Sequence, residues 1–437
     1  MDPLRNNHTR DPVQQKSAKI MSAKELRDLC IEAGADDVGF IETRRKAIVS
    51  EVHDILRIFS KSRTIISIAK KTNPDSIRSP SVSVANYEFA KVHQEIAEST
   101  QRILKKLNEV GFRGIAIPPG FPMDMDQWPG RIWEISHKPL AVEAGLGQMG
   151  MNRLVLHPVF GGYILLDTIL TDAELDTYNQ PIHENPCIEC GLCVSVCPVN
   201  AISRKNRIDF MSCAMHNYHE LFGGFQDWIE GIVMSKNVHT YRARFRDSET
   251  VTKWQSLTYG HFYRCSYCMA VCPAGENPMK EYQPEKKKYV QEVVKPLKTK
   301  KEPVYVIAGT FAEDAAMKNE NKKICHVRNT IRPHSISSFL DGVKLLFNPK
   351  QAAGLEMSIH FSFIGDEMKE AVVTIADGTI DVEETATGKA DLQVHADSET
   401  WIEMLNEETS LLRALVTGRI KLKGNPLYLK QFKKCMV

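Results

Sequence analysis

One short cysteine-rich run constrains this chain more than any other feature. Between Pro186 and Pro198 the cysteines follow the spacing C-x2-C-x2-C-x3-C-P, at Cys187, Cys190, Cys193 and Cys197. Three thiolates on one tight loop can hold three corners of an iron-sulfur cubane, and the proline then starts a separate turn that carries the fourth sulfur away. The run therefore predicts a second group of cysteines elsewhere in the chain.

That second group begins at Cys265, where a C-x2-C-x3-C-P run lacks its first cysteine. Cys213 is the only cysteine between the two runs, so it is the natural source of the missing ligand. The pattern resembles that of bacterial ferredoxins, in which each C-P cysteine ligates the other of two clusters. The predicted ligand sets for two 4Fe-4S clusters are Cys187, Cys190, Cys193 and Cys272, and Cys197, Cys213, Cys265 and Cys268.

Structural zinc and disulfides are the alternative uses of these cysteines. Zinc sites usually pair C-x2-C knuckles and need no third cysteine followed by C-P. Disulfides belong to oxidising compartments, and the first twenty residues contain no apolar secretory core. Iron-sulfur ligation is therefore the favoured prediction. The remaining cysteines, Cys30, Cys325 and Cys435, lie far apart and are expected to be ordinary thiols.

Length and charge restrict the class of protein. A chain of 437 residues has room for two or three domains. Its 56 Lys and Arg against 54 Asp and Glu leave a net charge of +2, too small to indicate a general nucleic-acid partner. The apolar run at 163–170 is too short for a membrane span and contains Asp167. These features predict a cytoplasmic protein with no transmembrane segment and no nucleic-acid partner.

The first part of the chain alternates helical and strand patterns. Residues 1–20 are polar and are expected to form a disordered leader. A helix is expected after Ser22, with Glu25 completing a capping box, and a long amphipathic helix is expected over 87–110. A short apolar run stands at 38–41, and the expected strands are 64–69, 114–117 and 163–170. This alternation predicts an α/β or α+β domain over residues 21–175.

A glycine-rich segment lies near the end of this domain. Gly145, Gly147 and Gly150 fall within six residues, and Asn152 and a Leu-His-Pro sequence at His157 follow them. Glycines at this density allow either the close approach of a ligand or a tight corner between a helix and a strand. The composition alone leaves both interpretations open.

The order Ala-Gly-Leu-Gly-x-x-Gly-x-Asn, Leu-His-Pro, strand and ferredoxin motif resembles the cobalamin-dependent epoxyqueuosine reductases and reductive dehalogenases over about residues 22–283. The resemblance implies a nitroreductase-like core that binds cobalamin. It also implies a ferredoxin-like domain over 176–283 and an external electron donor such as ferredoxin, flavodoxin or a flavin reductase. The residues implied to bind cobalamin are Gly145, Gly147, Gly150, Asn152 and His157.

The chain departs from this family pattern where a proton donor is needed. Arg131 stands thirteen residues before the Ala-Gly-Leu-Gly segment, where epoxyqueuosine reductases have an aspartate. The Ser-His-Lys at 136–138 is closer to the Ser-His-Arg of dehalogenases. Tyr87, Glu134 and His137 are the predicted catalytic proton donors, because reductive chemistry at carbon needs a donor within hydrogen-bond reach. Each can equally be a packed or ion-paired residue.

A basic stretch follows the second cysteine run. Its lysines predict a solvated linker, with an anionic membrane surface or an acidic redox partner as the alternative role. They are Lys286, Lys287, Lys288, Lys295, Lys298, Lys300 and Lys301. Residues 284–335 as a whole are assigned to this linker and a connector.

Residues 336–437 show a separate pattern of strands and helices. Strict alternation at 355–363 predicts a strand with one buried face, and more strands are expected at 371–375, 379–382 and 390–394. Ala390-Asp391, a helix around Trp401 and the segment 418–425 resemble the sterol carrier protein type-two family. The resemblance implies a mixed sheet and helices around an apolar tunnel for a lipophilic ligand. The same apolar faces can also fill a core.

The prediction is a multidomain α+β protein with a nitroreductase-like α/β core, a two-cluster ferredoxin-like domain and a sterol-carrier-like domain. It is predicted to be a cobalamin-dependent reductase that acts on an organic, lipophilic substrate through two 4Fe-4S clusters. The alternative is an electron-transfer or corrinoid-reducing activator protein with no small-molecule substrate of its own.

Overall fold

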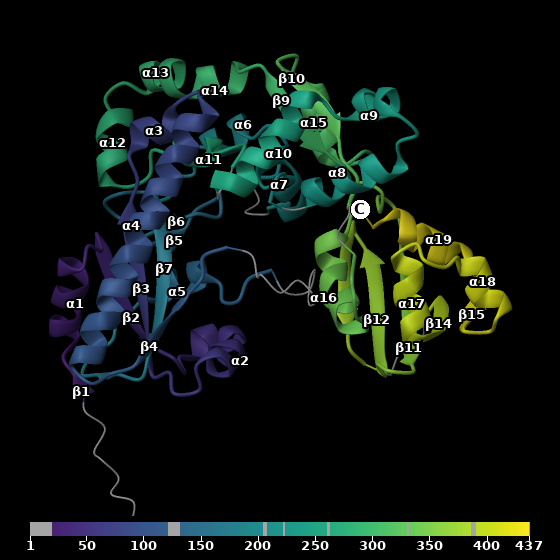
Figure 1. Ribbon diagram of the computed structural model, residues 1–437, viewed down its shortest axis with the longest axis horizontal. Coiled ribbons are helices and arrows are strands. Elements are labelled where there is room, and N and C mark those ends of the chain that lie inside the picture. Colours follow the sequence, from purple (N-terminus) through teal and green to yellow (C-terminus); the bar gives the residue numbers. More distant parts are fainter. Residues whose placement is uncertain are drawn as a thin grey trace, which may run out of the picture.

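The computed structural model describes residues 20–120, 132–203, 208–221, 223–259, 263–329, 332–385 and 390–436. The predictions on the leader and on Arg131 therefore lie outside the described residues. Figure 1 shows a helix-covered sheet at the left, a second sheet at the right, and short helices that bridge them. The architecture is mixed α/β, as predicted.

An antiparallel four-stranded sheet is the centre of the amino-terminal part. Its strands, in spatial order, are β2 (Asp37–Glu42), β3 (Thr64–Lys71), β7 (Ile164–Thr171) and β4 (Gly114–Ile117). Ile66 of β3 pairs with Phe40 on one side and with Ile169 on the other. The three predicted strands are confirmed, and the apolar run at 38–41 forms the fourth. Two smaller pairs are β1 (Ile20–Met21) with β8 (Glu174–Leu175), and β5 (Gln148–Met149) with β6 (Val155–Leu156).

Helices cover both faces of this sheet. On one face α1 (Ala23–Glu32) and α4 (Val82–Glu109) pack against Ile66 and Ile68. On the other face α2 (Val49–Ile58) and α5 (His137–Glu143) pack against Ile65 and Ala69. Successive strand residues point to opposite faces, so neighbours in β3 enter different cores. The expected capping box at Ser22 is wrong, because this side chain makes no capping hydrogen bond to α1.

Short helices form the middle of the chain. α6 (Leu192–Val196), α7 (Phe210–Asn217) and α11 (Tyr267–Ala270) carry cysteines. The other helices are α3 (Pro74–Arg78), α8 (Gly223–Met234), α9 (Val238–Arg244), α10 (Asp247–Tyr259) and α12 (Glu276–Tyr282). Within the part of the chain that the structure describes, no helix combines the length and apolar character needed to cross a membrane.

The basic stretch is helical rather than an open linker. α13 (Lys286–Tyr289), a π-helical turn (Val290–Val294) and α14 (Lys295–Thr299) follow one another. Tyr289, Val294 and Leu297 are buried in a cluster that also contains Tyr163 of the first sheet region. The prediction of a solvated linker is wrong for this apolar side of the helix, which is anchored to the amino-terminal part.

The connector that follows is a compact unit of its own. β9 (Glu302–Val306), α15 (Phe311–Met317) and β10 (Lys322–His326) form a parallel β-α-β arrangement. Lys322 is buried and its Nζ lies 2.6 Å from Glu302 Oε1, while the Tyr267 hydroxyl donates to Glu302 Oε2 at 2.6 Å. The connector is thereby tied to the second cysteine run.

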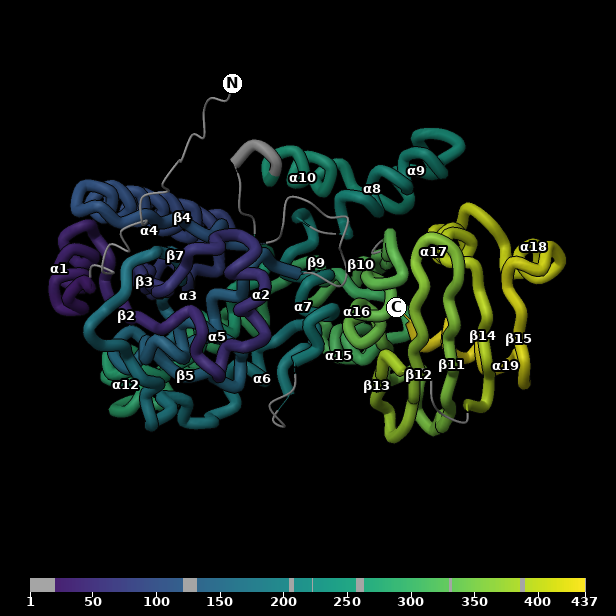
Figure 2. Tube along the Cα trace, turned by 90° about the horizontal axis from the view of Figure 1, so that it is seen from below, coloured from purple at the N-terminus to yellow at the C-terminus, as the bar shows by residue number. Residues whose placement is uncertain are grey.

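A five-stranded mixed sheet forms the carboxy-terminal part. Its order is β13 (Thr379–Glu383), β12 (Lys369–Ala376), β11 (Met357–Ile364), β14 (Leu392–Asp397) and β15 (Ile420–Gly424), as Figure 2 shows. Only β11 and β14 are parallel. The helices here are α16 (Ile336–Leu346), α17 (Ser398–Leu405), α18 (Leu411–Val416) and α19 (Leu427–Lys434).

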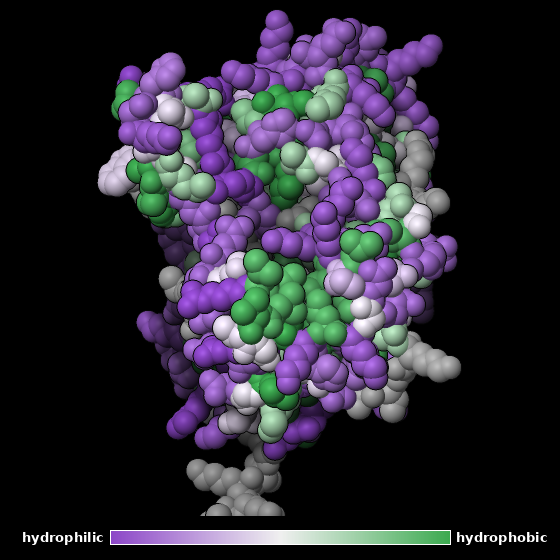
Figure 3. All heavy atoms as spheres, turned by 90° about the vertical axis from the view of Figure 1, so that its right-hand side faces the viewer, coloured by the Kyte–Doolittle hydropathy of each residue, from purple (hydrophilic) through white to green (hydrophobic). Residues whose placement is uncertain are grey.

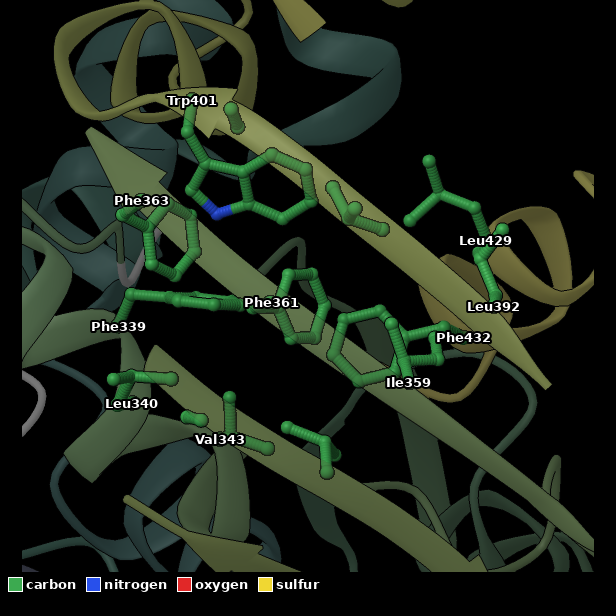
Figure 4. Packing of buried hydrophobic residues seen from close by; sticks show 14 of the residues in the cluster. Phe339, Leu340, Val343, Ile359, Phe361, Phe363, Leu392, Trp401, Leu429 and Phe432 are labelled. Atoms are coloured by element: carbon green, nitrogen blue, oxygen red, sulfur yellow. The ribbon is translucent and has the colours of Figure 1, made fainter. Parts of the chain in front are cut away.

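Aromatic side chains fill the interior between this sheet and its helices (Figure 4). The Phe361 ring lies 5.3 Å from the Trp401 ring and 5.7 Å from that of Phe363. Phe339 of α16 meets both phenylalanine rings edge-on. The alternating residues of β11 therefore build a packed core, and the apolar tunnel stays a prediction.

Candidate iron-sulfur centres

The first predicted ligand set surrounds one cavity. Its volume is about 310 Å³, including space open to solvent, and it is lined by Cys187, Cys190, Cys193 and Cys272. Asn152 and Leu156 of the amino-terminal part line another side of it. The thiols surround this space rather than converge on a point: among the described residues, no three His, Cys, Asp or Glu side chains are placed to hold a single metal ion.

Backbone turns aim these thiols at the cavity. Glu189 and Gly191 have φ angles of 50° and 74°, so the loop reverses direction twice between cysteines. The Asn185 side chain accepts a hydrogen bond from the backbone N–H of Cys187 at 2.9 Å and fixes the start of the loop. The three closely spaced cysteines are thus held by local geometry, while Cys272 arrives from a distant part of the chain.

The second predicted ligand set also comes together. Cys197 and Cys213 pack against the same small apolar cluster. Burial raises the pKa of Cys213 to about 12, and the neighbouring Cys197 raises it further. Burial likewise raises the pKa of Cys265 well above its ordinary value, with Cys268 and Cys197 adding to the rise. The Cys197 run therefore contributes to the group formed by Cys213, Cys265 and Cys268.

Two asparagines and a tyrosine position the second cysteine run. Asn217, at the end of α7, accepts a hydrogen bond from the backbone N–H of Cys265 at 2.9 Å. Asn152 donates to the carbonyl oxygen of Cys268 at 3.1 Å. Tyr163, which is buried, donates to the carbonyl oxygen of Ala270 at 2.7 Å. These contacts attach the cysteines to both α7 and the amino-terminal part, and no sequence motif marks Asn217.

A close backbone contact joins the two parts at Cys272. A Cβ on Gly161 would lie 1.9 Å from the carbonyl oxygen of Ala274, and one on Gly275 would lie 2.3 Å from the amide nitrogen of Gly161. The amide of Glu276 also donates to the carbonyl oxygen of Pro158 at 2.8 Å. The loop after Cys272 is thus held directly against the amino-terminal sheet region.

Lys138 lies beside the second group and was not among the predicted site residues. Burial lowers the pKa of its ammonium, and the nearby thiols of Cys268 and Cys213 oppose that effect. Lys138 follows His137 in α5, so this helix brings a cation from the amino-terminal part to the cysteines. The Ser-His-Lys sequence at 136–138 was the feature of the sequence that could have pointed to Lys138.

Buried charges lie next to the second group. Arg264 forms an ion pair with the fully buried carboxylate of Glu220, with Nε 2.7 Å from Oε1. The His219 ring stacks on Tyr305 at 3.8 Å, and its Nε2 lies 3.1 Å from Lys253 Nζ. Burial lowers the pKa of His219 well below its ordinary value, and Lys253 lowers it further. His219 is therefore neutral and belongs to a structural network.

The predicted cofactor-binding glycines are packed against the chain itself. A Cβ on Gly145 would lie 2.6 Å from the carbonyl oxygen of Gln180, and one on Gly147 would lie 2.4 Å from that of Leu156. A Cβ on Gly150 would lie 2.6 Å from the Leu156 side chain. These contacts favour the second interpretation of the segment, a tight corner that needs glycine for packing.

Asn152 and His157 are also occupied by protein groups. The Asn152 amide donates to Cys268, as described above, and its oxygen accepts from the backbone N–H of Leu154 at 3.2 Å. His157 Nε2 lies 2.9 Å from Asp37 Oδ2, and its Nδ1 accepts from the backbone N–H of Val159 at 3.1 Å. Both side chains are buried. The side chains of Asn152 and His157 are thus engaged by protein groups.

The three predicted proton donors are not brought together. Tyr87 is 68% exposed on α4, on the face of the sheet opposite α5. Glu134 lies 3.4 Å from Arg57 of α2. His137 Nδ1 lies 2.7 Å from the hydroxyl of Thr168, and burial lowers the pKa of His137 to about 4. His137 is therefore neutral at pH 7 and has no proton to give as an imidazolium.

Comparisons with known proteins agree with the cysteine chemistry. Residues 181–203 match the family model described as 4Fe-4S binding domain, and they contain the first cysteine run. Residues 327–437 match the model described as alkyl sulfatase C-terminal. The sterol-carrier resemblance has weaker support: sterol carrier protein 2 from Yarrowia lipolytica is 16% identical, with a TM-score of 0.20 over 23% of this chain and 91% of that one.

The chain is also similar to epoxyqueuosine reductases. The enzyme from Cyclobacterium marinum is 25% identical over 227 residues, which is 50% of this chain and 61% of that protein. The chain thus spans less than two thirds of that relative's length. The structure of epoxyqueuosine reductase from Streptococcus thermophilus is 16% identical, with a TM-score of 0.35 over 46% of this chain and 59% of that one. About half of this chain is therefore homologous to the epoxyqueuosine reductases, as its order of motifs predicted.

Proposed function

We propose that this chain is a cobalamin-dependent iron-sulfur reductase. The similarity to epoxyqueuosine reductases supports this function, as does the match of residues 181–203 to a 4Fe-4S binding domain. The single observation that carries the proposal is the crossed arrangement of the cysteines. Cys272 joins the group around Cys187, and Cys197 joins the group around Cys265. This arrangement suits two neighbouring clusters between which electrons can pass.

Both groups border the amino-terminal part, which is therefore the proposed destination of the electrons. Leu156 and Asn152 line the cavity of the first group, and Lys138 lies beside the second. Clusters held by these cysteines would pass electrons from an external donor toward an organic substrate bound at the amino-terminal part. Such an enzyme works where thiols stay reduced, so we also propose a cytoplasmic location.

Cobalamin, when bound, supplies a cobalt centre that accepts electrons from a cluster. Of the five residues predicted to hold it, Asn152 and His157 do not fit that role, because protein groups already bind their side-chain polar atoms, and the three glycines are packed against the chain itself. We assign no step to them. We propose that His137 stays neutral and holds the Thr168 hydroxyl of β7 in place. It would then not act as a proton donor.

A lipophilic substrate is the proposed class. The carboxy-terminal part supports this choice through its match to the alkyl sulfatase C-terminal model and its resemblance to sterol carrier proteins. This unit would deliver the substrate or bind it beside the reductase part.

Anaerobic reconstitution tests the proposal. The full chain is purified without oxygen, supplied with iron and sulfide, and then mixed with hydroxocobalamin and passed through a desalting column. We expect iron and sulfide contents that match two clusters, and a corrinoid visible spectrum that elutes with the protein. The unreconstituted chain is the control for nonspecific corrinoid binding. Full clusters without any retained corrinoid would contradict the proposal and favour the electron-transfer alternative.

A further inference from the structure

The carboxy-terminal unit exposes one apolar helix face. In α18, Leu411 and Leu415 pack partly against the aromatic core, whereas Leu412 is 72% exposed and Val416 is 80% exposed. Successive helix residues turn by about 100°, so these four side chains share one face. The inner edge of that face contacts the core and its outer edge lies in solvent. Packing against the core explains why Leu411 and Leu415 are apolar, but it does not explain the exposed apolar side chains of Leu412 and Val416.

Neighbouring residues enlarge this apolar face into a patch. Ile402 and Leu405 of α17 and Leu422 of β15 are half-buried against the same core, β15 contacts α18, and Leu427 at the start of α19 is 60% exposed. Figure 3, which looks onto this end of the molecule, shows a continuous apolar patch bordered by hydrophilic side chains. Continuous exposed patches of this kind mark interaction sites rather than ordinary surface.

The same stretch of chain is strongly basic. Residues 411–437 contain no Asp or Glu, although the whole chain has nearly equal numbers of acids and bases. Their seven cations are Arg413, Arg419, Lys421, Lys423, Lys430, Lys433 and Lys434. All seven residues are exposed, and among the described residues none of them has a carboxylate within ion-pair distance. Lys421 and Lys423 alternate with Ile420 and Leu422 along β15, at the edge of the sheet, so the two lysines leave this edge on the solvent face, opposite the core.

We propose that this α18 surface, meaning the apolar patch with its seven cations, binds an anionic phospholipid bilayer. Exposed leucine and valine side chains enter the boundary between headgroups and acyl chains, while lysine and arginine side chains bind the headgroups. A second copy of the chain would bring seven cations against seven others, so charge disfavours self-association through this surface. Lysines on an edge strand also prevent pairing with another sheet, but that role does not need an apolar helix face beside them.

The inference is independent of the reductase chemistry, because no cysteine and no residue of the amino-terminal part takes part. It also differs from a lipophilic ligand bound inside the carboxy-terminal unit, since the patch lies on the outside of the core. Loss of reductase activity would leave this binding intact.

Vesicle co-sedimentation of the full chain tests the proposal. We expect binding to vesicles of equal parts phosphatidylcholine and phosphatidylserine, weak binding to phosphatidylcholine alone, and loss of binding in high salt. The double substitution Leu412→Ser with Val416→Ser should weaken binding about tenfold, and Lys421→Ser with Lys423→Ser should do the same. The substituted side chains are exposed, so unchanged melting temperatures should accompany both effects.

Matched controls separate this surface from others. Val49→Ser with Val84→Ser removes two exposed apolar side chains from the amino-terminal part. Lys287→Ser with Lys298→Ser removes two exposed cations from the basic helix. Both control variants should bind vesicles like the unchanged chain. If the test and control variants lost vesicle binding equally, the proposal would be overturned. Binding to an acidic protein such as bovine serum albumin, with no binding to either kind of vesicle, would also overturn it.

Discussion

Gly161 and Ala274 approach so closely that a Cβ on Gly161 would lie 1.9 Å from the carbonyl oxygen of Ala274. Ala274 follows Cys272 by two residues, so this contact connects the first sheet region to a predicted cluster ligand. The distance leaves no room for any side chain at position 161, and the φ angle of 63° would strain the backbone of any residue other than glycine at this position.

Gly161→Ala should therefore destabilise the protein by about 3 kcal/mol, since overpacking and left-handed strain both contribute. Gly111→Ala is the matched control, because Gly111 also has a positive φ of 91° but a Cβ there would meet nothing within 4 Å. Chemical denaturation of both variants measures the difference. Equal losses of stability would show that the contact with Ala274 contributes nothing.

Cys272→Ala should remove one cluster and spare the other. The cavity around Cys187, Cys190 and Cys193 would lose its fourth thiol, so the iron content should fall by about half. Cys197→Ala should cause the same loss from the other group. Iron and sulfide analysis with electron paramagnetic resonance checks both variants, and Cys325→Ala is the control for a thiol outside the two groups. A complete iron complement in Cys272→Ala would contradict the crossed arrangement.

Asn152→Asp should loosen the second cysteine run. The carboxylate would face the carbonyl oxygen of Cys268, which now accepts a hydrogen bond at 3.1 Å, and a buried acceptor would lose its donor. The expected cost is about 2 kcal/mol. Thermal melting of the reconstituted protein measures it. Asn319→Asp is a matched control, because this side chain also donates to a backbone carbonyl, that of Lys298, but through an exposed hydrogen bond, so the melting temperature should change little.

Asp167 should make stability depend on pH. Burial raises its pKa from 3.8 to about 6, although Thr100 and the Thr168 amide donate hydrogen bonds to it. Because the folded state binds this proton more tightly, the stabilisation is complete below about pH 4 and is lost as pH rises through about 6. Asp167→Asn should therefore be more stable than the unchanged chain by about 2 kcal/mol at pH 8, and similar to it at pH 4.

Denaturant unfolding at several pH values measures this effect. Asp366→Asn, which changes an exposed carboxylate, should leave the pH dependence as it is. A constant difference between Asp167→Asn and the unchanged chain across this pH range would show that Asp167 does not titrate in the folded state.

The strands were predictable because their signal is local. Thr64–Lys71 and Met357–Ile364 each show the apolar pattern that their own burial requires. The basic stretch was misread since its lysines dominate the composition, although Tyr289, Val294 and Leu297 form one buried helix face at spacings of five and three residues. That periodicity was the stronger signal.

The glycine-rich segment could not be interpreted from its own residues. Gly145 is required by the approach of Gln180, and Gly147 by that of Leu156, and neither contact leaves a trace in the local sequence. The two cysteine groups, in contrast, could be predicted from the sequence. The spacing of the ligands fixes their geometry, and the number of thiols restricts which cysteine can belong to which cluster. The proton donors failed to converge because their assignment rested on neighbourhood in sequence, while α4 and α5 lie on opposite faces of the sheet.

The exchange of Cys197 and Cys272 between the two groups has a consequence for biosynthesis. The second ligand set is complete only once Cys268 has been made and the first only with Cys272, so about 4 to 15 seconds pass between the synthesis of Cys197 and that of Cys272 at ordinary rates of elongation. Each cluster can therefore be completed only after the second cysteine run has been made, so the thiols of the first run must stay reduced until then.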